Sequence, residues 1–256
     1  MPLHLTADRK TWRCELDGHS FDVAKEGYVN LLVTHQRKAR PPGDSIAMLR
    51  ARRRFLDGGW YEPLRDAIAA ALPSGDVLDI GCGEGYYTRD LATARVWGVD
   101  IAKEAVRLAA HRRAAYEADT ASYAVGNAYD LPVLDGSMDA LVSVFSPLHT
   151  DEFDRVLRPG GGRAVVVTPG PDHLAGLAEV LFADAVRHDD APPFERPGAT
   201  TERVRFDLAL TGEAIADLIA MTPYSWFVPE ARRMDVSSRP FLSTPAEFLV
   251  TTYQLR

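Results

Sequence analysis

The sequence predicts an α/β fold built on a parallel, doubly wound sheet. Short apolar runs alternate with helical stretches through residues 76–169, and such alternation is typical of βαβ units. A glycine-rich segment at 81–85 follows the first apolar run and precedes a helix, as in sheets that bind a ligand at that turn. An α+β fold with antiparallel strands is the alternative.

The composition limits the class of protein. Hydrophobic residues make up 46% of the 256 residues and charged residues 25%, which excludes a disordered or fibrous chain. No apolar run approaches the roughly 18 residues of a membrane span, and the N-terminus lacks a signal-peptide pattern, so we expect a cytoplasmic protein. Two cysteines, Cys14 and Cys82, cannot form a disulfide framework. The net charge of −7 argues against a surface that binds nucleic acid everywhere, but it allows a local basic patch.

The first part of the chain differs from the rest in composition and in hydrophobic pattern. Residues 1–45 are polar and short-patterned, and the Pro-Pro-Gly sequence that follows Arg40 interrupts any helix. We therefore expect a small N-terminal module at 1–42 and a larger domain at 43–256. Ser45 is the predicted N-cap of a helix that ends before Gly58.

The remaining elements follow from hydrophobic periodicity and from breaks at glycine and proline. A second helix is expected at 62–72. In the middle of the chain we expect strands at 77–80, 95–100, 122–127, 139–145 and 163–168, with helices at about 86–94, through 113, and at 152–156. The C-terminal part is expected to contain a helix at 173–186, a strand at 204–210, a helix at 211–221 and a last strand at 241–253.

The most informative feature is the glycine loop formed by Gly81, Gly83 and Gly85. Glycines there let the backbone approach a ligand closely. Dinucleotide-binding loops have the spacing G-x-G-x-x-G and bind a pyrophosphate, whereas here the third glycine comes one residue early and Glu84 lies inside the loop. Because a carboxylate repels pyrophosphate but attracts an ammonium or sulfonium group, the loop favours S-adenosylmethionine over NAD.

Polar residues that flank the loop support the same cofactor. Asp79 precedes the loop and can meet a cationic amino-acid group, or it can serve as a structural acid that binds the loop amides. Asp100 ends the next strand about twenty residues on, where a carboxylate accepts ribose hydroxyls. Asn127 follows the third strand, where an amide can bind the adenine edge.

Together with 158–161, these residues resemble the class I S-adenosylmethionine-dependent methyltransferases. Residues 18–32, GHSFDVAKEGYVNLL, look like the N-terminal signature of the large-subunit (23S) rRNA guanine-N1 methyltransferases. Further segments resemble the same family over nearly the whole chain: 42–45, 51–57, 60–64, 168–174 and 222–226.

The resemblance implies a zinc-binding N-terminal module joined to a Rossmann-like class I methyltransferase domain. The family methylates N1 of a guanine in a hairpin of large-subunit rRNA, sometimes conferring resistance to macrolide-type antibiotics, and it tends to form homodimers. Residues equivalent to Tyr61, Glu84, Gly85 and His173 help to hold the cofactor in that family.

The chain departs from the family at the zinc site. That site uses a C-x-x-C pair followed by a Cys and a His, and Cys14 and His19 match only the second pair. His4 is the one other early candidate, so four tetrahedral ligands cannot be assembled and we expect no metal. If the module helps to bind RNA, its degeneration leaves a second acceptor open: a guanine-like heterocycle in a small molecule of secondary metabolism.

Three side chains are candidates for the acceptor site. Phe145 follows the fourth strand and can stack on a planar base or belong to the core. His149 is a candidate base or a surface histidine, and Trp226 can line the acceptor pocket or the core.

A basic cluster has two readings. Its members can contact RNA phosphates or form a solvated helix face balanced by acids; they are Arg37, Lys38, Arg40, Arg50, Arg52, Arg53 and Arg54. The sequence thus predicts an S-adenosylmethionine-dependent N-methyltransferase acting on guanine. A non-catalytic binding protein with this fold and an NAD oxidoreductase are the rival hypotheses.

Overall fold

The chain folds into two compact units. The structure, a computed structural model, describes residues 3–14, 18–32, 44–89, 91, 95–115, 121–184, 187–188, 193–194 and 196–255, without the side chains of 112–115. Unit 1 comprises Met1–Gly43, Ala71–Val165 and Tyr253–Arg256; unit 2 comprises Asp44–Ala70 and Val166–Thr252.

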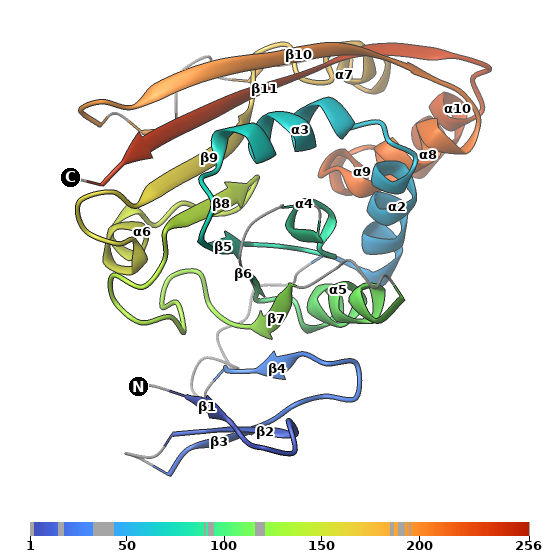
Figure 1. The fold of residues 1–256 in the computed structure, drawn as a ribbon. Helices are drawn as coiled ribbons and strands as arrows, with labels where there is room; N and C mark the ends of the chain where they lie inside the picture. The colour runs from blue at the N-terminus through green and yellow to red at the C-terminus, as the bar shows by residue number, and fades with distance from the viewer. Residues whose placement is uncertain are drawn as a thin grey trace. The chain divides into compact units, whose positions relative to one another are not determined.

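A parallel sheet forms the centre of unit 1 (Figure 1). Strand β5 (Asp76–Ile80) pairs with β6 (Arg95–Asp100) on one side and with β8 (Ala140–Val144) on the other. Beyond β6 lie β7 (Ser122–Val125) and then β4 (Val29–Asn30), both parallel to their neighbours. The chain thus runs outward from β5 and returns to its other side at β8, which creates a topological switch point between these two strands.

The apolar runs that predicted these strands fill the core of unit 1. Val77, Leu78 and Ile80 on β5 are completely buried, and so are Leu141 and Val142 on β8. Strands of a parallel sheet are buried on both faces, which is why they read as continuous apolar runs. The connecting helices are α4 (Tyr86–Arg89), α5 (Lys103–Ala115) and α6 (Thr150–Val156). The predicted α/β class is confirmed.

The N-terminal residues form a separate antiparallel sheet within unit 1. It consists of β1 (His4–Leu5), β2 (Thr11–Arg13) and β3 (Ser20–Asp22). Trp12 on β2 packs edge-on against Trp97 on β6, with 6.4 Å between ring centroids. The predicted boundary at residues 42 and 43 falls within 33–43, outside the described residues, and stays a prediction.

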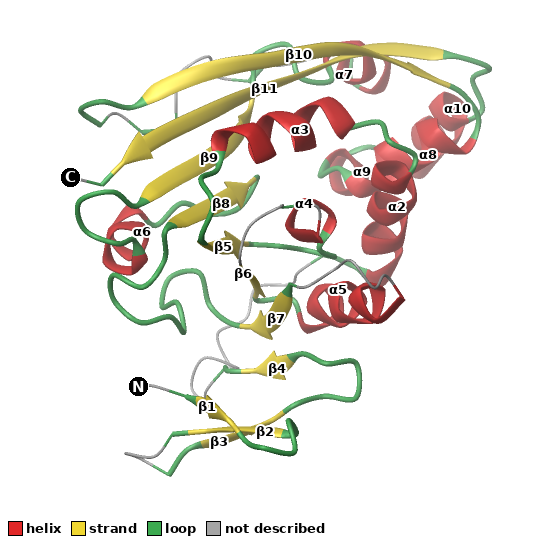
Figure 2. Cartoon of the chain, viewed as in Figure 1, coloured by secondary structure: helices red, strands yellow, loops and turns green. Residues whose placement is uncertain are grey.

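Helices dominate one part of unit 2. The predicted helix after Ser45 is α2 (Ile46–Asp57), and the Ser45 hydroxyl accepts a hydrogen bond from the amide of Met48 at 3.2 Å, as an N-cap does. Helix α2 packs against α8 (Glu213–Met221), and the Arg54 Nε donates to Asp217 of α8 at 3.0 Å. Helices α9 (Tyr224–Phe227) and α10 (Glu230–Ser237) adjoin α8 (Figure 2).

A long antiparallel ribbon forms the other part of unit 2. Strand β10 (Thr200–Leu210) pairs with β11 (Leu242–Gln254) along its whole length, from Thr200 opposite Thr252 to Leu210 opposite Leu242. Strand β11 in turn lies beside β9 (Arg163–Pro169), whose last residues belong to unit 2. The remaining helices of the described part of unit 2 are α3 (Glu62–Ala71) and α7 (Ala175–Leu181).

Several boundaries differ from those expected. The helix predicted at 173–186 is shorter, and α9 and α10 were not predicted. The helix predicted at 86–94 extends to Arg89, with 90 and 92–94 outside the described residues. In the parts of the chain that are described, no helix has the length and apolar character that a membrane span requires.

Candidate functional site: the glycine loop and its surroundings

The glycine loop connects β5 to α4 in a conformation that only glycine adopts readily. The φ angles of Gly81, Gly83 and Gly85 are 75°, 56° and 80°, in the left-handed region where a Cβ atom is strained. The amide of Gly81 donates to the carbonyl of Val99 on β6 at 2.8 Å, which holds the start of the loop against the sheet. The three glycines are therefore required by the backbone itself, as the sequence predicted.

The loop also passes close to side chains of neighbouring strands. A Cβ atom on Gly81 would lie 2.2 Å from the Oγ of Ser146, and one on Gly85 would lie 2.8 Å from the Oη of Tyr123. Ser146 comes just after β8, so the ends of β5 and β8 meet here. Ligands of doubly wound sheets bind at the carboxyl ends of the strands at this switch point.

Acidic side chains surround the loop. Asp79 is 1% exposed, and its Oδ2 accepts a hydrogen bond from the hydroxyl of Thr88 on α4 at 2.5 Å. Burial raises the pKa of Asp79 to about 7; the bond from Thr88 opposes this shift, and the charges of Asp100 and Glu84 add to it. Glu84 is buried as well. The site therefore concentrates negative charge where water is excluded, which favours a cation.

Asp100 connects the loop to the end of β6. Its Oδ2 accepts from the amide of Gly83 at 2.9 Å and its Oδ1 from the amide of Ala102 at 2.7 Å. A carboxylate oxygen has two lone pairs, so an oxygen that accepts from an amide can also accept from a hydroxyl. These contacts fit S-adenosylmethionine: the acids suit its cationic amino-acid and sulfonium groups, and Asp100 suits its ribose.

Asn127 lies at the end of β7, within the same unit. Its side-chain Oδ1 accepts a hydrogen bond from the amide of Tyr129 at 3.1 Å, which forms a local turn. This bond fixes the orientation of the amide group. The predicted contact with an adenine edge stays a prediction.

Phe145 is not a core residue. Its side chain is 48% exposed and its φ angle is 53°, one of three positive values among the described non-glycine residues. Such strain persists only where the surroundings impose it, and it is concentrated at functional sites. Since Ser146 touches the glycine loop, the ring of Phe145 belongs to the same edge of the sheet.

His149 acts as the N-cap of α6. Its Nδ1 accepts from the amide of Glu152 at 3.4 Å, and its ring lies edge-on to Tyr129 with 5.4 Å between centroids. A neutral histidine that accepts at Nδ1 carries its proton on Nε2. In this state the ring is a hydrogen-bond donor, which argues against the predicted role as a base.

Unit 2 brings together two other predicted cofactor residues, Tyr61 and His173, whose ring centroids lie 6.3 Å apart. Phe248 contacts both rings, at 5.0 Å and 4.7 Å. The hydroxyl of Tyr61 is buried without a hydrogen-bond partner among the described residues, and burial raises the pKa of this tyrosine. A buried donor of this kind requires a partner, and a bound ligand can supply one.

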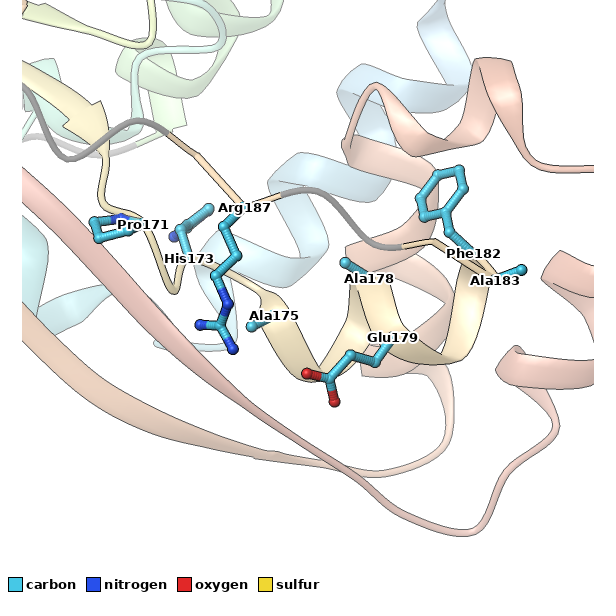
Figure 3. Close-up of a pocket in the computed structure, with 8 residues that line it drawn as sticks. All are labelled: Pro171, His173, Ala175, Ala178, Glu179, Phe182, Ala183 and Arg187. Carbon is cyan, nitrogen blue, oxygen red and sulfur yellow. The ribbon is translucent and has the colours of Figure 1, made fainter.

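A cavity of about 330 Å³ adjoins His173 in unit 2 (Figure 3). Pro171, Phe182 and Arg187 line it together with small residues of α7. Burial, followed by the charge of nearby His188, lowers the pKa of His173 to about 3, so its ring is neutral at physiological pH.

Trp226 lies elsewhere in unit 2. It is 59% exposed, so the alternative of a core position is wrong, and its indole Nε1 donates to the Met48 sulfur of α2 at 3.2 Å.

Cys14 and His19 lie close together in the N-terminal sheet, where the Cys14 amide donates to the His19 carbonyl at 2.9 Å. The described residues contain no group of three potential metal ligands.

Three residues were not predicted: Thr88 and Ser146, which lie beside the loop, and Glu247 on β11. Thr88 follows the loop by three residues, a spacing that places it on the first turn of α4. Glu247 is a single carboxylate within the apolar run of the last strand, and its Oε2 accepts from the amide of Asp172 at 2.7 Å. Ser146 could not be recognised from the sequence, because it matters only through its side chain, which fills the space beside Gly81.

Comparison with known proteins agrees with this geometry. Residues 77–161 match the family described as a methyltransferase domain, and residues 2–40 match the family described as RlmA, N-terminal, a zinc ribbon. The chain is 39% identical to the 23S rRNA (guanine(748)-N(1))-methyltransferase of Streptomyces fradiae, over 87% of this chain and 82% of that protein.

A solved structure supports the fold independently. The YcgJ protein of Bacillus subtilis superimposes with a TM-score of 0.51 at 16% identity, over 77% of this chain and 99% of that one. The chain therefore belongs to the family of 23S rRNA guanine-N1 methyltransferases, which are S-adenosylmethionine-dependent enzymes of class I fold.

Proposed function

We propose that the chain transfers a methyl group from S-adenosylmethionine to N1 of a guanine in 23S rRNA. The main support from geometry is the strained, exposed Phe145, which follows β8 directly and adjoins the residue that touches the glycine loop. The activity printed for the relative from Streptomyces fradiae supports the same acceptor.

The cofactor residues divide by the group that each suits. Asp79 and Glu84 suit the cationic part of the cofactor, Asp100 the ribose and Asn127 the adenine, while the glycines allow close backbone approach. Tyr61 and His173, whose rings lie together in unit 2, are proposed for cofactor binding on the family resemblance alone. When bound, S-adenosylmethionine supplies an electrophilic methyl group.

The chain's own contribution to the chemistry is mainly alignment. Stacking on Phe145 would hold the guanine plane, and holding two reactants in line accounts for much of the rate of such a transfer. N1 of guanine loses its proton as the methyl group is added, so an acceptor is needed. A backbone carbonyl after β8 would accept a hydrogen bond from N1–H and orient it, and the proton would leave to solvent as the N–CH3 bond forms. His149 suits the role of base less well, because its Nδ1 accepts the bond that caps α6.

The basic cluster contributes less positive charge than its composition indicates. Arg52 pairs with Asp44, Arg53 with Asp57 and Arg54 with Asp217, which favours the balanced helix face. Arg37, Lys38 and Arg40 lie outside the described residues. These ion pairs are the observation that keeps a small guanine-like acceptor as the second candidate.

Methyl transfer from tritiated S-adenosylmethionine would test the acceptor. Large-subunit rRNA lacking the modification, a synthetic hairpin and free guanosine should be compared at equal guanine concentration. We expect label in the RNA at guanine N1 and little in guanosine. Label in guanosine alone would overturn the rRNA proposal, and transfer to neither would favour a binding protein. Sedimentation of the same preparation would test the homodimer that the family resemblance implies.

A further inference from the structure

Two aromatic side chains of unit 1 meet at the carboxyl edge of its parallel sheet. His149 lies five residues after β8 ends at Val144, and Tyr129 lies four residues after β7 ends at Val125. Their rings pack edge-on, with 5.4 Å between the centroids and 78° between the planes. Tyr129 is 55% exposed, so the pair can be reached by a large substrate.

Charged side chains of α6 fix the loop that carries Tyr129. The Oε2 of Glu152 accepts a hydrogen bond from the amide of Leu131 at 2.7 Å. Arg155 donates to the carbonyl of Leu131 at 2.9 Å and to that of Val133 at 2.7 Å. The bond from Arg155 also holds the pKa of Glu152 below its usual range, so the carboxylate stays ionised. The loop that runs from β7 to α6 is therefore bound to the helix that His149 begins (Figure 1).

The hydrogen bond that caps α6 determines which nitrogen of His149 carries a hydrogen. A backbone amide only donates, so Nδ1 accepts from Glu152 and the ring has its hydrogen on Nε2. In the described part of the chain, Nε2 has no hydrogen-bond partner. The ring of Tyr129 limits rotation of the imidazole. His149 therefore presents one N–H donor in a fixed orientation.

The segment after β8 brings this donor to the acceptor site. Ser146 touches the glycine loop, and the strained, exposed Phe145 precedes it. His149 follows Phe145 by four residues, and even a fully extended chain of that length spans at most about 14 Å. A guanine that stacks on Phe145 therefore lies within reach of the His149 side chain.

We propose that His149 is a catalytic residue that donates its Nε2–H to O6 of the acceptor guanine. This inference rests on the proposed function, which makes guanine N1 the methyl acceptor. When the N1–H proton leaves to solvent, resonance shares the electron pair left on N1 with O6. That pair forms the N–CH3 bond as the S–CH3 bond breaks and the sulfur becomes a neutral thioether. A donor aimed at O6 stabilises the negative charge that develops before the new bond is complete.

A donor at O6 has two further consequences. It favours the deprotonated form of guanine, so the proton leaves N1 more readily without a side-chain base. It also discriminates between purines, because adenine carries an amino group where guanine has O6, and a donor that faces a donor is unfavourable. His149 thus contributes to the rate and to the choice of base.

Two substitutions at position 149 separate the donor from the helix cap. In His149→Asn the side-chain oxygen still caps α6, since asparagine is among the best N-cap residues, but no N–H reaches the position of Nε2. In His149→Gln an amide N–H reaches that position while the cap is weakened. His111→Asn is the control, because His111 is an exposed histidine of α5 in the same unit. Methyl transfer to the rRNA hairpin, affinity for S-adenosylhomocysteine by calorimetry and melting temperature would be measured for each.

We expect His149→Asn to lower kcat about 100-fold, as removal of one donor from a developing anion does, with melting temperature and S-adenosylhomocysteine affinity unchanged. His149→Gln should keep most of the rate and melt at a lower temperature. His111→Asn should change none of the three measurements. An unchanged kcat in His149→Asn would overturn the donor role, and so would a folded His149→Gln that is as slow as His149→Asn.

A change in the substrate tests the contact itself. A hairpin with 6-thioguanine at the target position has sulfur, a weaker acceptor, in place of O6. If Nε2–H binds O6, the rate difference between the unmodified chain and His149→Asn should be much smaller on this hairpin. An equal difference on both hairpins would overturn the contact, and this comparison decides the question should His149→Gln fail to fold. Absence of methyl transfer by the unmodified chain to guanine in RNA and to guanosine alike would instead overturn the proposed function.

Discussion

Replacing Gly81 with alanine tests the glycine loop most directly, because two separate costs can be worked out from the structure. The φ angle of 75° lies in the left-handed region, which costs an alanine about 1–2 kcal/mol. The new Cβ atom would also lie 2.2 Å from the Oγ of Ser146 and 2.5 Å from its Cβ, an overlap that costs about 1–3 kcal/mol to relieve. Gly81→Ala should therefore lower the free energy of unfolding by about 2–5 kcal/mol.

Two further variants separate these costs. Gly160 has a φ angle of 73° with nothing within 4 Å of its added Cβ, so Gly160→Ala should show only the backbone cost, about 1–2 kcal/mol. Adding Ser146→Gly to Gly81→Ala removes the overlapping atoms. The double variant should therefore regain the free energy lost to the overlap, but not the free energy lost to the backbone strain. Urea denaturation would supply the free energies for all three.

Cofactor affinity is the second readout for these variants. If the loop backbone cradles the ligand, Gly81→Ala should weaken S-adenosylhomocysteine binding by about tenfold or more, since the loop must move to admit the methyl group. Gly160→Ala should bind normally. Equal stability losses at the two glycines, with unchanged affinity at both, would refute the assignment of the loop.

Other substitutions test charge and the acceptor. Between pH 3.8 and about 7 the folded chain keeps a proton on Asp79 that the unfolded chain releases, so raising the pH through this window should lower the free energy of unfolding, and Asp79→Asn should remove this dependence in denaturation curves. Phe145→Leu should lower kcat/KM for RNA by about tenfold with little change in stability, because stacking a base on a ring is worth roughly 1–3 kcal/mol; unchanged kinetics would exclude stacking. Arg50 is exposed and has no ion pair among the described residues, so Arg50→Glu should weaken RNA binding and reduce its salt dependence while the fold stays stable. Arg54→Glu should instead lower the free energy of unfolding, measured by denaturation, because it places a second carboxylate beside Asp217. Equal effects of Arg50→Glu and Arg54→Glu on RNA binding would contradict the assignment of Arg50 to RNA and of Arg54 to the fold.

The strands of unit 1 were predictable because burial on both faces leaves a nearly continuous apolar run, as at Val77–Ile80 and Leu141–Val144, each with a single polar residue in it. The short strands β1 to β4 were not, because two or three residues give too little pattern to recognise. Helices α9 and α10 each follow a proline and are short, so tertiary contacts with α8 decide the structure more than local propensity does.

The candidate site divides in the same way. Gly81, Gly83 and Asp100 could be predicted because their roles depend on neighbours in sequence and on the strand–loop–helix order. The strain at Phe145 and the anchoring by Glu247 could not, since each depends on contacts between distant parts of the chain: Glu247 and Asp172 are 75 residues apart. Residues that position others give a weak signal because their partners come from another element.

Two buried carboxylates of the chain, Glu247 and Asp79, differ in their partners and in the direction of their pKa shifts. The difference argues for a cationic ligand at the loop. Glu247 is paired with two arginines and has a lowered pKa, as expected for an acid that stabilises the fold. Among the described residues, Asp79 has only the hydroxyl of Thr88 as a hydrogen-bond donor. Burial raises its pKa, and Asp100 and Glu84 add charge of the same sign. An amide at position 79 would accept the same hydroxyl without the cost of a buried charge, so stability alone does not explain the acid. A ligand with a positive charge explains it, because such a ligand stabilises the ionised form that burial disfavours. A dinucleotide pyrophosphate would increase the repulsion instead, so the same arrangement that costs the unliganded chain stability also selects its cofactor.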